Sequence, residues 1–359
     1  MTPVTLITGF LGTGKTTAIR SLLEQRPSDE RWGVFINEYG IVSLDEALLD
    51  LPDDSPVSVQ ELAGGCFCCE TAELFKPMLV QFLRRVRPHR LLIEPSGAGH
   101  PASVLDMLRE SRFFSSHLSL QAVICLVDPQ DADNPRIRSN PVFHDQLEMA
   151  DIVAINHTDH RSPDSIARCR ALIEELDPPK LLIAETAHGQ LQSHWLTLSG
   201  SVLRSPRFPD AHAATPTAPT TPASDASAPL VQLGATVPVN GEQRTIAAVP
   251  EPGRPLLFPS SGSGWYACGW LFSAEERFRR EPLLDLLESW GGVQRLKGVF
   301  HCDDDWWSIN RAKRESSIRR SCWRRDSRLE IIVDQPFDWD QLAAKIQECL
   351  VPQARIPKP

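Results

Sequence analysis

The sequence of 359 residues lacks the segments that anchor a protein in a membrane or direct its export. No apolar run approaches the roughly 18–20 residues that a membrane-spanning helix needs. Residues 1–8 have neither the basic start nor the long apolar core of a signal peptide. We therefore expect a soluble, cytoplasmic protein that has no membrane partner.

Positive charge is also in short supply, because 37 Lys and Arg stand against 46 Asp and Glu, a formal net charge of −9. Neutralising nucleic-acid phosphates requires a clustered excess of Lys and Arg. One stretch, residues 311–328, carries eight Lys and Arg with Trp323 among them, and it could contact nucleic acid or an acidic partner. Basic runs are more often solvated faces of strands or hairpins. We favour that interpretation and expect no nucleic-acid partner.

The cysteines are odd in number and unevenly placed, which argues against a disulfide framework. Of the nine cysteines, three fall within four positions in residues 64–69, Gly-Gly-Cys-Phe-Cys-Cys. In a reducing compartment such a cluster indicates metal binding or redox chemistry. Cys125 and Cys169 fit a buried strand and a helix, so we expect both to be core residues.

The first half of the chain alternates short apolar runs with longer amphipathic segments. This alternation predicts an α/β domain with a mostly parallel sheet flanked by helices. The predicted strands are 4–8, 33–37, 90–94, 121–128, 152–156 and 181–185, and the predicted helices are 15–25, 72–86 and 165–176.

A change of composition predicts a second domain. In residues 205–229, 20 of the 25 residues are Pro, Ala, Ser or Thr. The segment has too few large apolar side chains for their burial to offset the conformational entropy lost on ordering. We therefore predict a first domain at 1–204, a linker at 205–229 and a smaller C-terminal α+β domain at 230–359. That domain has predicted strands at 266–271, 298–302, 306–310 and 329–333, and predicted helices at 281–290 and 339–350.

Residues 9–16, here called the phosphate loop, match the pattern G-x-x-x-x-G-K-[ST] between a predicted strand and a predicted helix. The glycines allow successive backbone N–H groups to surround phosphates. Lys15 places its charge on the β- and γ-phosphates, and the Thr16 hydroxyl can ligate Mg²⁺. The first domain is thus a predicted P-loop NTPase domain. Its candidate nucleotide-binding residues here are Gly9, Gly12, Thr13, Gly14, Lys15, Thr16 and Thr17.

A second motif, N-x-x-D, ends the strand predicted at 152–156 and indicates which base is bound. The carboxylate of Asp159 can accept two hydrogen bonds from the N1–H and amino group of guanine, whereas adenine has no such pair of donors. Asn156 would brace the loop and approach the ring. His157 stands where the usual N-K-x-D signature has Lys, and an imidazole could stack on the base instead. An ordinary strand-end turn also uses Asn and Asp, but after a phosphate loop we favour GTP.

The cysteine loop, residues 64–69, can bring three thiolates to one soft cation, because Gly64 and Gly65 make the backbone adaptable. Zn²⁺ is the first candidate, and Co²⁺ or Ni²⁺ would also be accommodated. Two sulfurs or all three could bind, and a fourth ligand would come from elsewhere. Redox sensing or three structural thiols are the alternatives. The candidate ligands are Cys66, Cys68 and Cys69, with Glu38, Glu61 or His100 as the fourth.

Taken in order, five motifs resemble the CobW-type family of metallochaperone GTPases. They are GFLGTGKTT at the phosphate loop, Asn37-Glu38-Tyr39-Gly40, GGCFCC at the cysteine loop, Ile93-Glu94-Pro95-Ser96-Gly97, and N-x-T-D. The resemblance covers about residues 1–200. It extends more weakly into the C-terminal domain through Arg295-Leu-Lys297-Gly298. The linker is longer and richer in Pro and Ala than that family's junction, and the absence of a His-rich tract argues against metal storage.

The resemblance implies GTP and Mg²⁺ in the first domain, a transferred metal on the cysteine loop, and hydrolysis that drives delivery to a client metalloprotein. Lys15, Glu94 and Glu38 are then the catalytic candidates. Glu38 lies in the segment similar to the family's switch and is also a candidate metal ligand. Glu94 lies in a Walker-B-like segment, where it either holds Mg²⁺ through water or orients the attacking water. A homo-oligomer remains open.

Two other classes use part of the same pattern. A P-loop ATPase or kinase needs the phosphate loop but has no need of Asp159 or the clustered thiols. A regulatory GTPase needs the first two motifs but transfers no metal.

Overall fold

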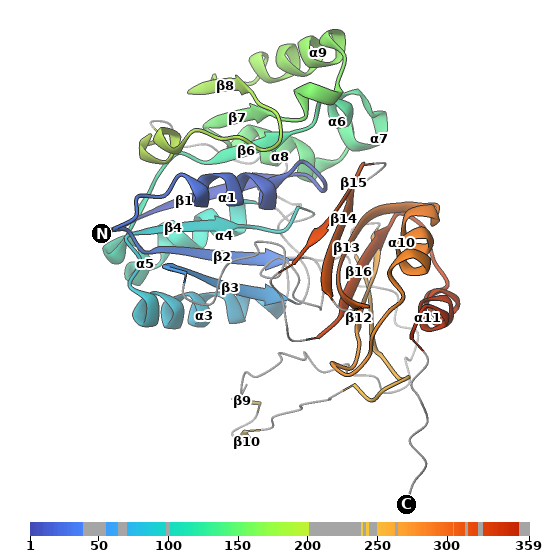
Figure 1. Cartoon of the computed structure of the whole chain (residues 1–359). Coiled ribbons are helices and arrows are strands. Elements are labelled where there is room, and N and C mark those ends of the chain that lie inside the picture. The colour runs from blue at the N-terminus through green and yellow to red at the C-terminus, as the bar shows by residue number, and fades with distance from the viewer. Residues whose placement is uncertain are drawn as a thin grey trace, which may run out of the picture. The chain divides into compact units, whose positions relative to one another are not determined.

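The structure is a computed structural model (Figure 1). It describes residues 1–38, 55–63, 70–97, 101–200, 238–239, 242–243, 250–262, 265–303, 305–312, 315–321 and 326–351. The described residues form two compact units, one up to residue 200 and the other from residue 238. The linker predicted at 205–229 lies outside the described residues, so its limits stay a prediction.

The first unit is built on one sheet, in which all the described strand pairs are parallel. The strand order is β3-β2-β4-β1-β6-β7-β8, and the short β5 pairs with β1. Because the strands are parallel, their carboxyl ends meet at one edge of the sheet. The strands are β1 (Thr2–Gly9), β2 (Trp32–Glu38), β3 (Val57–Ala63), β4 (Arg90–Glu94), β5 (Leu118–Leu120), β6 (Ile124–Val127), β7 (Ile152–Ile155) and β8 (Leu182–Glu185).

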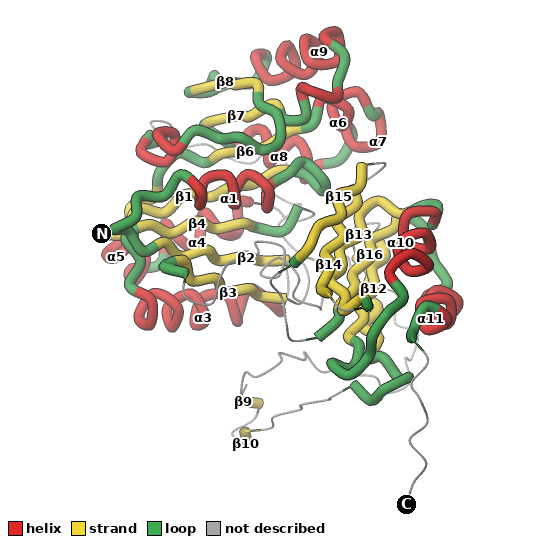
Figure 2. The backbone as a smooth tube through the Cα atoms, viewed as in Figure 1, coloured by secondary structure: helices red, strands yellow, loops and turns green. Residues whose placement is uncertain are grey.

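Helices cover both faces of this sheet (Figure 2), which explains why its strands carry continuous apolar runs. Every residue of β6 and β7 is buried, as expected for strands covered on both sides. The helices are α1 (Lys15–Glu24), α3 (Glu70–Val86), α4 (Pro101–Glu110), α5 (Arg112–His117), α6 (Pro129–Asp133), α7 (Pro135–Arg138), α8 (Pro141–Met149) and α9 (Pro163–Glu174), with 3-10 turns η1 (Thr158–His160) and η2 (Ser193–Thr197).

Four successive helices, α6 to α9, begin in the same way. Each starts with Pro, whose missing N–H is not needed in the first turn. The side chain just before that Pro accepts a backbone N–H of the helix, and these caps are Asp128, Asn134, Asn140 and Ser162. A cap of this kind stabilises a helix by about 1 kcal/mol. The local sequence therefore sets where each of these helices starts.

The second unit is an antiparallel sheet in the order β11-β12-β16-β13-β14-β15. Its two helices lie on one face (Figure 1), where Leu283 and Leu287 of one helix and Leu342 and Ile346 of the other join the core around Trp270. A separate short pair is formed by β9 (Pro238–Val239) and β10 (Glu242–Gln243). The other elements are β11 (Leu256–Gly262), β12 (Trp265–Leu271), α10 (Arg280–Ser289), β13 (Val293–Cys302), β14 (Asp305–Ala312), β15 (Glu315–Arg320), β16 (Arg328–Val333) and α11 (Trp339–Glu348).

The predicted fold class is confirmed, since an α/β unit with a parallel sheet is followed by a smaller unit with an antiparallel sheet and two helices. The strand predicted at 121–128 is too long, because Asp128 caps α6 instead of extending β6. The strand predicted at 298–302 is too short, because β13 already begins at Val293. Among the described residues, no helix combines the length and apolar character needed to cross a membrane.

Candidate functional site

The phosphate loop follows β1 and depends on glycine at its first position. Gly9 has φ +141°, and a Cβ added there would lie 2.3 Å from the Leu126 carbonyl oxygen of β6. No other residue fits this backbone without displacing the neighbouring strand. Gly14 of the same loop also has a positive φ, +90°, and α1 begins at the next residue with no side-chain cap on its first turn. The N-terminal N–H groups of α1 can therefore serve an anion.

Lys15 lies against the phosphate loop, with only 5% of its surface exposed. Its Nζ donates a hydrogen bond to the Phe10 carbonyl oxygen over 3.1 Å. The segment after β4 approaches the same amine, since a Cβ added at Gly97 would lie 2.8 Å from Lys15 Nζ. The end of β4 and the phosphate loop thus meet at this ammonium group.

Thr16, in the first turn of α1, faces Glu94 at the end of β4. The Thr16 hydroxyl donates to the Glu94 carboxylate and lies 3.3 Å from both of its oxygens. Glu94 is only 3% exposed. A hydroxyl and a buried carboxylate beside a phosphate loop are the hard oxygen ligands that Mg²⁺ prefers. These two residues fit the magnesium site that the sequence analysis predicted.

Asn156 joins three loops at the same edge of the sheet. Its Nδ2 donates to the Thr13 carbonyl oxygen of the phosphate loop over 2.9 Å. Its Oδ1 accepts the Gly189 backbone N–H over 3.1 Å, from the segment that follows β8. Asn156 is 1% exposed, so both bonds are shielded from water. The amide fixes the start of the base loop, residues 156–161, against the phosphate loop.

Asp159 lies between two histidines. Its Oδ2 is 2.9 Å from Nε2 of His160 and 3.3 Å from Nε2 of His188. His188 belongs to the segment after β8 and has φ +54°, an uncommon backbone conformation for a residue other than Gly. His188 and Gly189 carry no signal in the sequence beyond their place after a predicted strand. The carboxylate that is predicted to read guanine is thus oriented from two loops.

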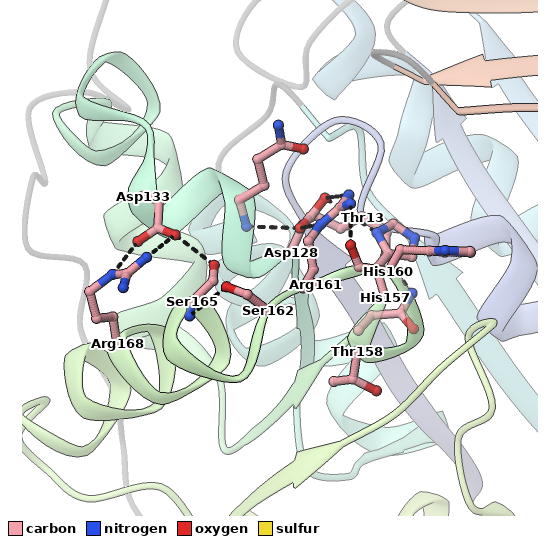
Figure 3. Close-up of polar contacts among 12 residues, drawn as sticks. Thr13, Asp128, Asp133, His157, Thr158, His160, Arg161, Ser162, Ser165 and Arg168 are labelled. Atoms are coloured by element: carbon pink, nitrogen blue, oxygen red, sulfur yellow. Dashed lines mark hydrogen bonds and ion pairs between the residues drawn. The ribbon is translucent and has the colours of Figure 1, made fainter.

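Asp128 anchors the base loop, as Figure 3 shows. It is 1% exposed and accepts two hydrogen bonds from Arg161, Nε to Oδ1 at 2.8 Å and Nη2 to Oδ2 at 2.9 Å. His157 Nδ1 lies 3.3 Å from Oδ2, and the Gln130 backbone N–H donates to Oδ1 over 2.9 Å. A bidentate Arg–carboxylate pair is among the strong interactions of proteins. Asp128 thus contacts the base loop near its start, at His157, and at its end, at Arg161.

His157 takes the place of the Lys in N-K-x-D, and the structure shows what holds it there. Its backbone is left-handed, with φ +61°. Its Nε2 points to Gly14, where an added Cβ would lie 3.5 Å away, while its Nδ1 faces Asp128. His157 therefore bridges the phosphate loop and the Asp128 anchor.

A second ion pair supports this arrangement from outside. Asp133, at the end of α6, accepts Arg168 Nε over 2.8 Å and Nη2 over 2.7 Å, and also the Ser165 hydroxyl of α9 over 2.6 Å (Figure 3). The hydrogen bond from Arg168 is the main cause that holds the pKa of Asp133 below its usual value. The contact ties α6, which Asp128 caps, to α9, which follows the base loop.

The cysteine loop and His100 lie outside the described residues, and so does the side chain of Glu38. The backbone of Glu38 is described, and its Cα pairs with that of Ala63, the residue just before the loop. Glu61 of β3 is buried at 6% exposure. Among the described side chains, no three His, Cys, Asp or Glu residues form a group able to hold a metal ion.

The other described cysteines are core residues. Cys125 and Cys169 are 1% and 0% exposed, which confirms the prediction for both. Burial is the largest cause that raises the pKa of each thiol to about 12. Cys268 and Cys302 have a pKa raised to about 12 in the same way, and burial raises the pKa of Cys349 as well. Thiols in this state are poor nucleophiles and poor metal ligands.

Known proteins share both units. The family model for the CobW/HypB/UreG nucleotide-binding domain matches residues 3–183, and that for the cobalamin synthesis protein cobW C-terminal domain matches residues 267–350. The chain is 33% identical to zinc chaperone YeiR of Escherichia coli over 347 residues, which cover 96% of this chain and 97% of that protein. It is 32% identical to zinc chaperone CobW of Pseudomonas aeruginosa over 218 residues, covering 53% and 57%. The solved zinc-bound YjiA GTPase from E. coli aligns with 97% of this chain and 98% of that chain at 17% identity, with a TM-score of 0.38.

Proposed function

This chain belongs to the CobW/HypB/UreG family of P-loop GTPases, and we propose that it is a metallochaperone. In this proposal it binds a transition metal, first of all Zn²⁺, at Cys66, Cys68 and Cys69. GTP binding and hydrolysis control the capture of the metal and its delivery to a client metalloprotein. The relatives named zinc chaperones support Zn²⁺ over Co²⁺ or Ni²⁺.

The observation that carries the proposal is the register of β2, β3 and β4. Ile36 of β2 pairs with Glu94 of β4, and two residues later Glu38 pairs with Ala63 of β3. The end of β3, which leads into the cysteine loop, therefore lies one strand away from the end of β4, which carries the Mg²⁺ candidate, and β2 with Glu38 runs between them. A segment placed next to the γ-phosphate can couple nucleotide state to a remote event by changing its order.

The geometry supports the following nucleotide roles. Lys15 would neutralise the β- and γ-phosphates, and backbone N–H groups at Gly12, Thr13, Gly14 and Thr17 would hold phosphate oxygens. Bound Mg²⁺ supplies charge neutralisation at the phosphates. Thr16 and Glu94 would hold it, and Glu94 or Glu38 would orient the attacking water.

Guanine selection is assigned to Asp159, with Asn156 fixing the loop. Since Asp159 approaches His160 and His188 through one oxygen, Oδ2, the other carboxylate oxygen and further lone pairs can accept the guanine donors. Competition of GTP and ATP for the purified protein tests this assignment. Equal affinities for the two nucleotides would leave a P-loop ATPase or kinase in place of the GTPase site proposed for residues 156–159.

The metal role is tested by measuring Zn²⁺ affinity with a GTP analogue plus Mg²⁺ and again with GDP. We expect the two affinities to differ, and Cys66→Ser to weaken Zn²⁺ binding by at least about tenfold, because a thiolate ligand is lost. Binding should also weaken at low pH, because the thiols must lose protons to bind metal. Cys349→Ser is the matched control, since this cysteine lies in the other unit with a raised pKa, and it should leave Zn²⁺ binding unchanged.

Two results would contradict the proposal in different ways. If the protein binds no transition metal in any nucleotide state, the metallochaperone role is wrong and a regulatory GTPase remains. If Zn²⁺ affinity and client binding are the same with GTP analogue and GDP, the coupling is wrong although the metal site stands.

A further inference from the structure

Helix α8 contacts the phosphate loop and the segment after β4 at the same time. Phe143 of α8 packs edge-to-face on Phe10 of the phosphate loop, with ring centroids 6.2 Å apart. One turn later, Gln146 donates from Nε2 to the Gly97 carbonyl oxygen over 3.1 Å. Gln146 is 1% exposed. A buried amide donor aimed at a loop carbonyl, 49 residues away in sequence, fixes that peptide more firmly than a solvated one would.

Gly97 is packed tightly on its other side. A Cβ added to Gly97 would lie 2.8 Å from Lys15 Nζ and 3.1 Å from the Leu11 backbone N. The backbone at Gly97 therefore occupies the space next to the amine that binds the β- and γ-phosphates. In the proposed function, Asn156 and Asp159 lie at the base, the far end of the nucleotide. Gly97 is thus on the side of the terminal phosphate.

We propose that Gln146 is a positioning residue that lets the protein distinguish GTP from GDP. By holding the Gly97 carbonyl, Gln146 keeps the Gly97 peptide beside Lys15, where the γ-phosphate of GTP reaches and GDP has no group. This proposal rests on the proposed GTPase function and adds a residue to its site. The helix that bears Gln146 also leads directly into β7 and the base loop, so both ends of the nucleotide share one support.

A purely structural role makes a different prediction. If Gln146 only stabilises the fold, its loss should weaken GTP and GDP binding by the same factor, together with the free energy of unfolding. If Gln146 positions Gly97 for the γ-phosphate, its removal should weaken the binding of GTP but not that of GDP. The ratio of the two affinities therefore separates the roles.

The test uses two variants of the full chain. Gln146→Met keeps the length and flexibility of the side chain but removes the donor. Gln146→Glu keeps the shape and places an acceptor against the Gly97 carbonyl. Both should bind GDP within about twofold of the wild type and bind a GTP analogue with Mg²⁺ about tenfold more weakly, the usual range for one buried hydrogen bond. We expect kcat for GTP hydrolysis to fall in both.

Gln121→Met is the matched control. Gln121 also donates its Nε2 to a backbone carbonyl, that of Ser119 over 2.9 Å, but it precedes β6 at the opposite edge of the sheet. It should change neither affinity. Equal weakening of GTP analogue and GDP by the Gln146 variants, or no change in either, would overturn the positioning role. A wild type that binds no guanine nucleotide would instead overturn the proposed function together with this inference.

Discussion

The phosphate loop takes its shape from glycine backbone, whereas the base loop takes its shape from side chains that come from other elements. At Gly9 the constraint is steric, because the β6 carbonyl oxygen leaves no room for a Cβ. At the base loop the constraints are Asn156 with Thr13 and Arg161 with Asp128. The phosphate loop should therefore lose its conformation when an atom is added, and the base loop should lose its conformation when a polar partner is removed.

The largest effect should come from adding one carbon to the phosphate loop. Gly9→Ala forces a Cβ to 2.3 Å from the Leu126 carbonyl oxygen at a left-handed φ. We expect a loss of about 3 kcal/mol or more in the free energy of unfolding and no detectable GTP binding. Chemical denaturation and nucleotide titration measure both. Gly253→Ala is the control for strain alone, because φ is +78° and a Cβ there meets nothing within 4 Å. If both variants lose the same free energy of unfolding, close packing against Leu126 does not determine the shape of the phosphate loop.

The next largest effect should come from splitting the Asp128–Arg161 pair. Arg161→Met leaves a carboxylate that is 1% exposed without its main cation, which should cost about 3 kcal/mol. Asp128→Asn should cost a similar amount, and the double variant should cost clearly less than the sum of the two. Chemical denaturation of the four proteins gives the coupling. Additive losses would mean that the pair does not hold the base loop.

A smaller effect, on nucleotide affinity, should come from changing Asp159 in the base loop. Asp159→Asn replaces an acceptor by a donor opposite the guanine amine. We expect GTP and GDP to lose about 2 kcal/mol of binding free energy each, while a xanthine nucleotide, which has an oxygen at that position, binds better than to the wild type. Isothermal titration checks the three ligands. A loss for GTP but not for GDP would place Asp159 on the phosphate side and contradict its assignment to the base.

The smallest effect belongs to the outer pair, Asp133 with Arg168. Their side chains are 31% and 61% exposed, so solvent screens the attraction. The folded-state pKa of Asp133 is lowered, so its contribution to stability is present above the usual pKa of about 3.9 and is lost as the pH falls through the lowered value. Asp133→Asn should therefore be slightly less stable than the wild type at pH 7, with the difference shrinking toward about pH 3. A difference that is constant over this range would exclude the ion pair as its source.

The two loops also differ in how far sequence reasoning reaches. The phosphate loop is a local pattern, so its residues and its place between β1 and α1 could be predicted. The base loop is held by contacts across 143 residues for Asn156 and Thr13 and 33 residues for Arg161 and Asp128, which no local pattern encodes. Asp128 was even assigned to a strand, because its run of apolar neighbours hid its role as a cap.

The fold class could be predicted, but the shortest elements could not, for a related physical reason. β5 has three residues and α7 four, too short for a hydrophobic period to be distinguished from chance. Gln146 gave no signal, since a buried polar residue on an amphipathic helix is recognised only once its partner carbonyl is known. The roles of the cysteine loop and Glu38 stay predictions, since the described side chains do not include them.

The amount of zinc that the chain can bind depends on whether it is folded, because five of its cysteines are buried. They are Cys125, Cys169, Cys268, Cys302 and Cys349. Folding withdraws these five of the nine thiols from solution, so they add nothing to a metal titration of the native protein. The denatured chain offers all nine sulfurs. A ligand that binds the unfolded state stabilises the folded state less than its native affinity implies. Low concentrations of zinc should therefore raise the melting temperature. High concentrations should lower it, because the denatured chain, with more sulfurs available, then binds more zinc than the native protein.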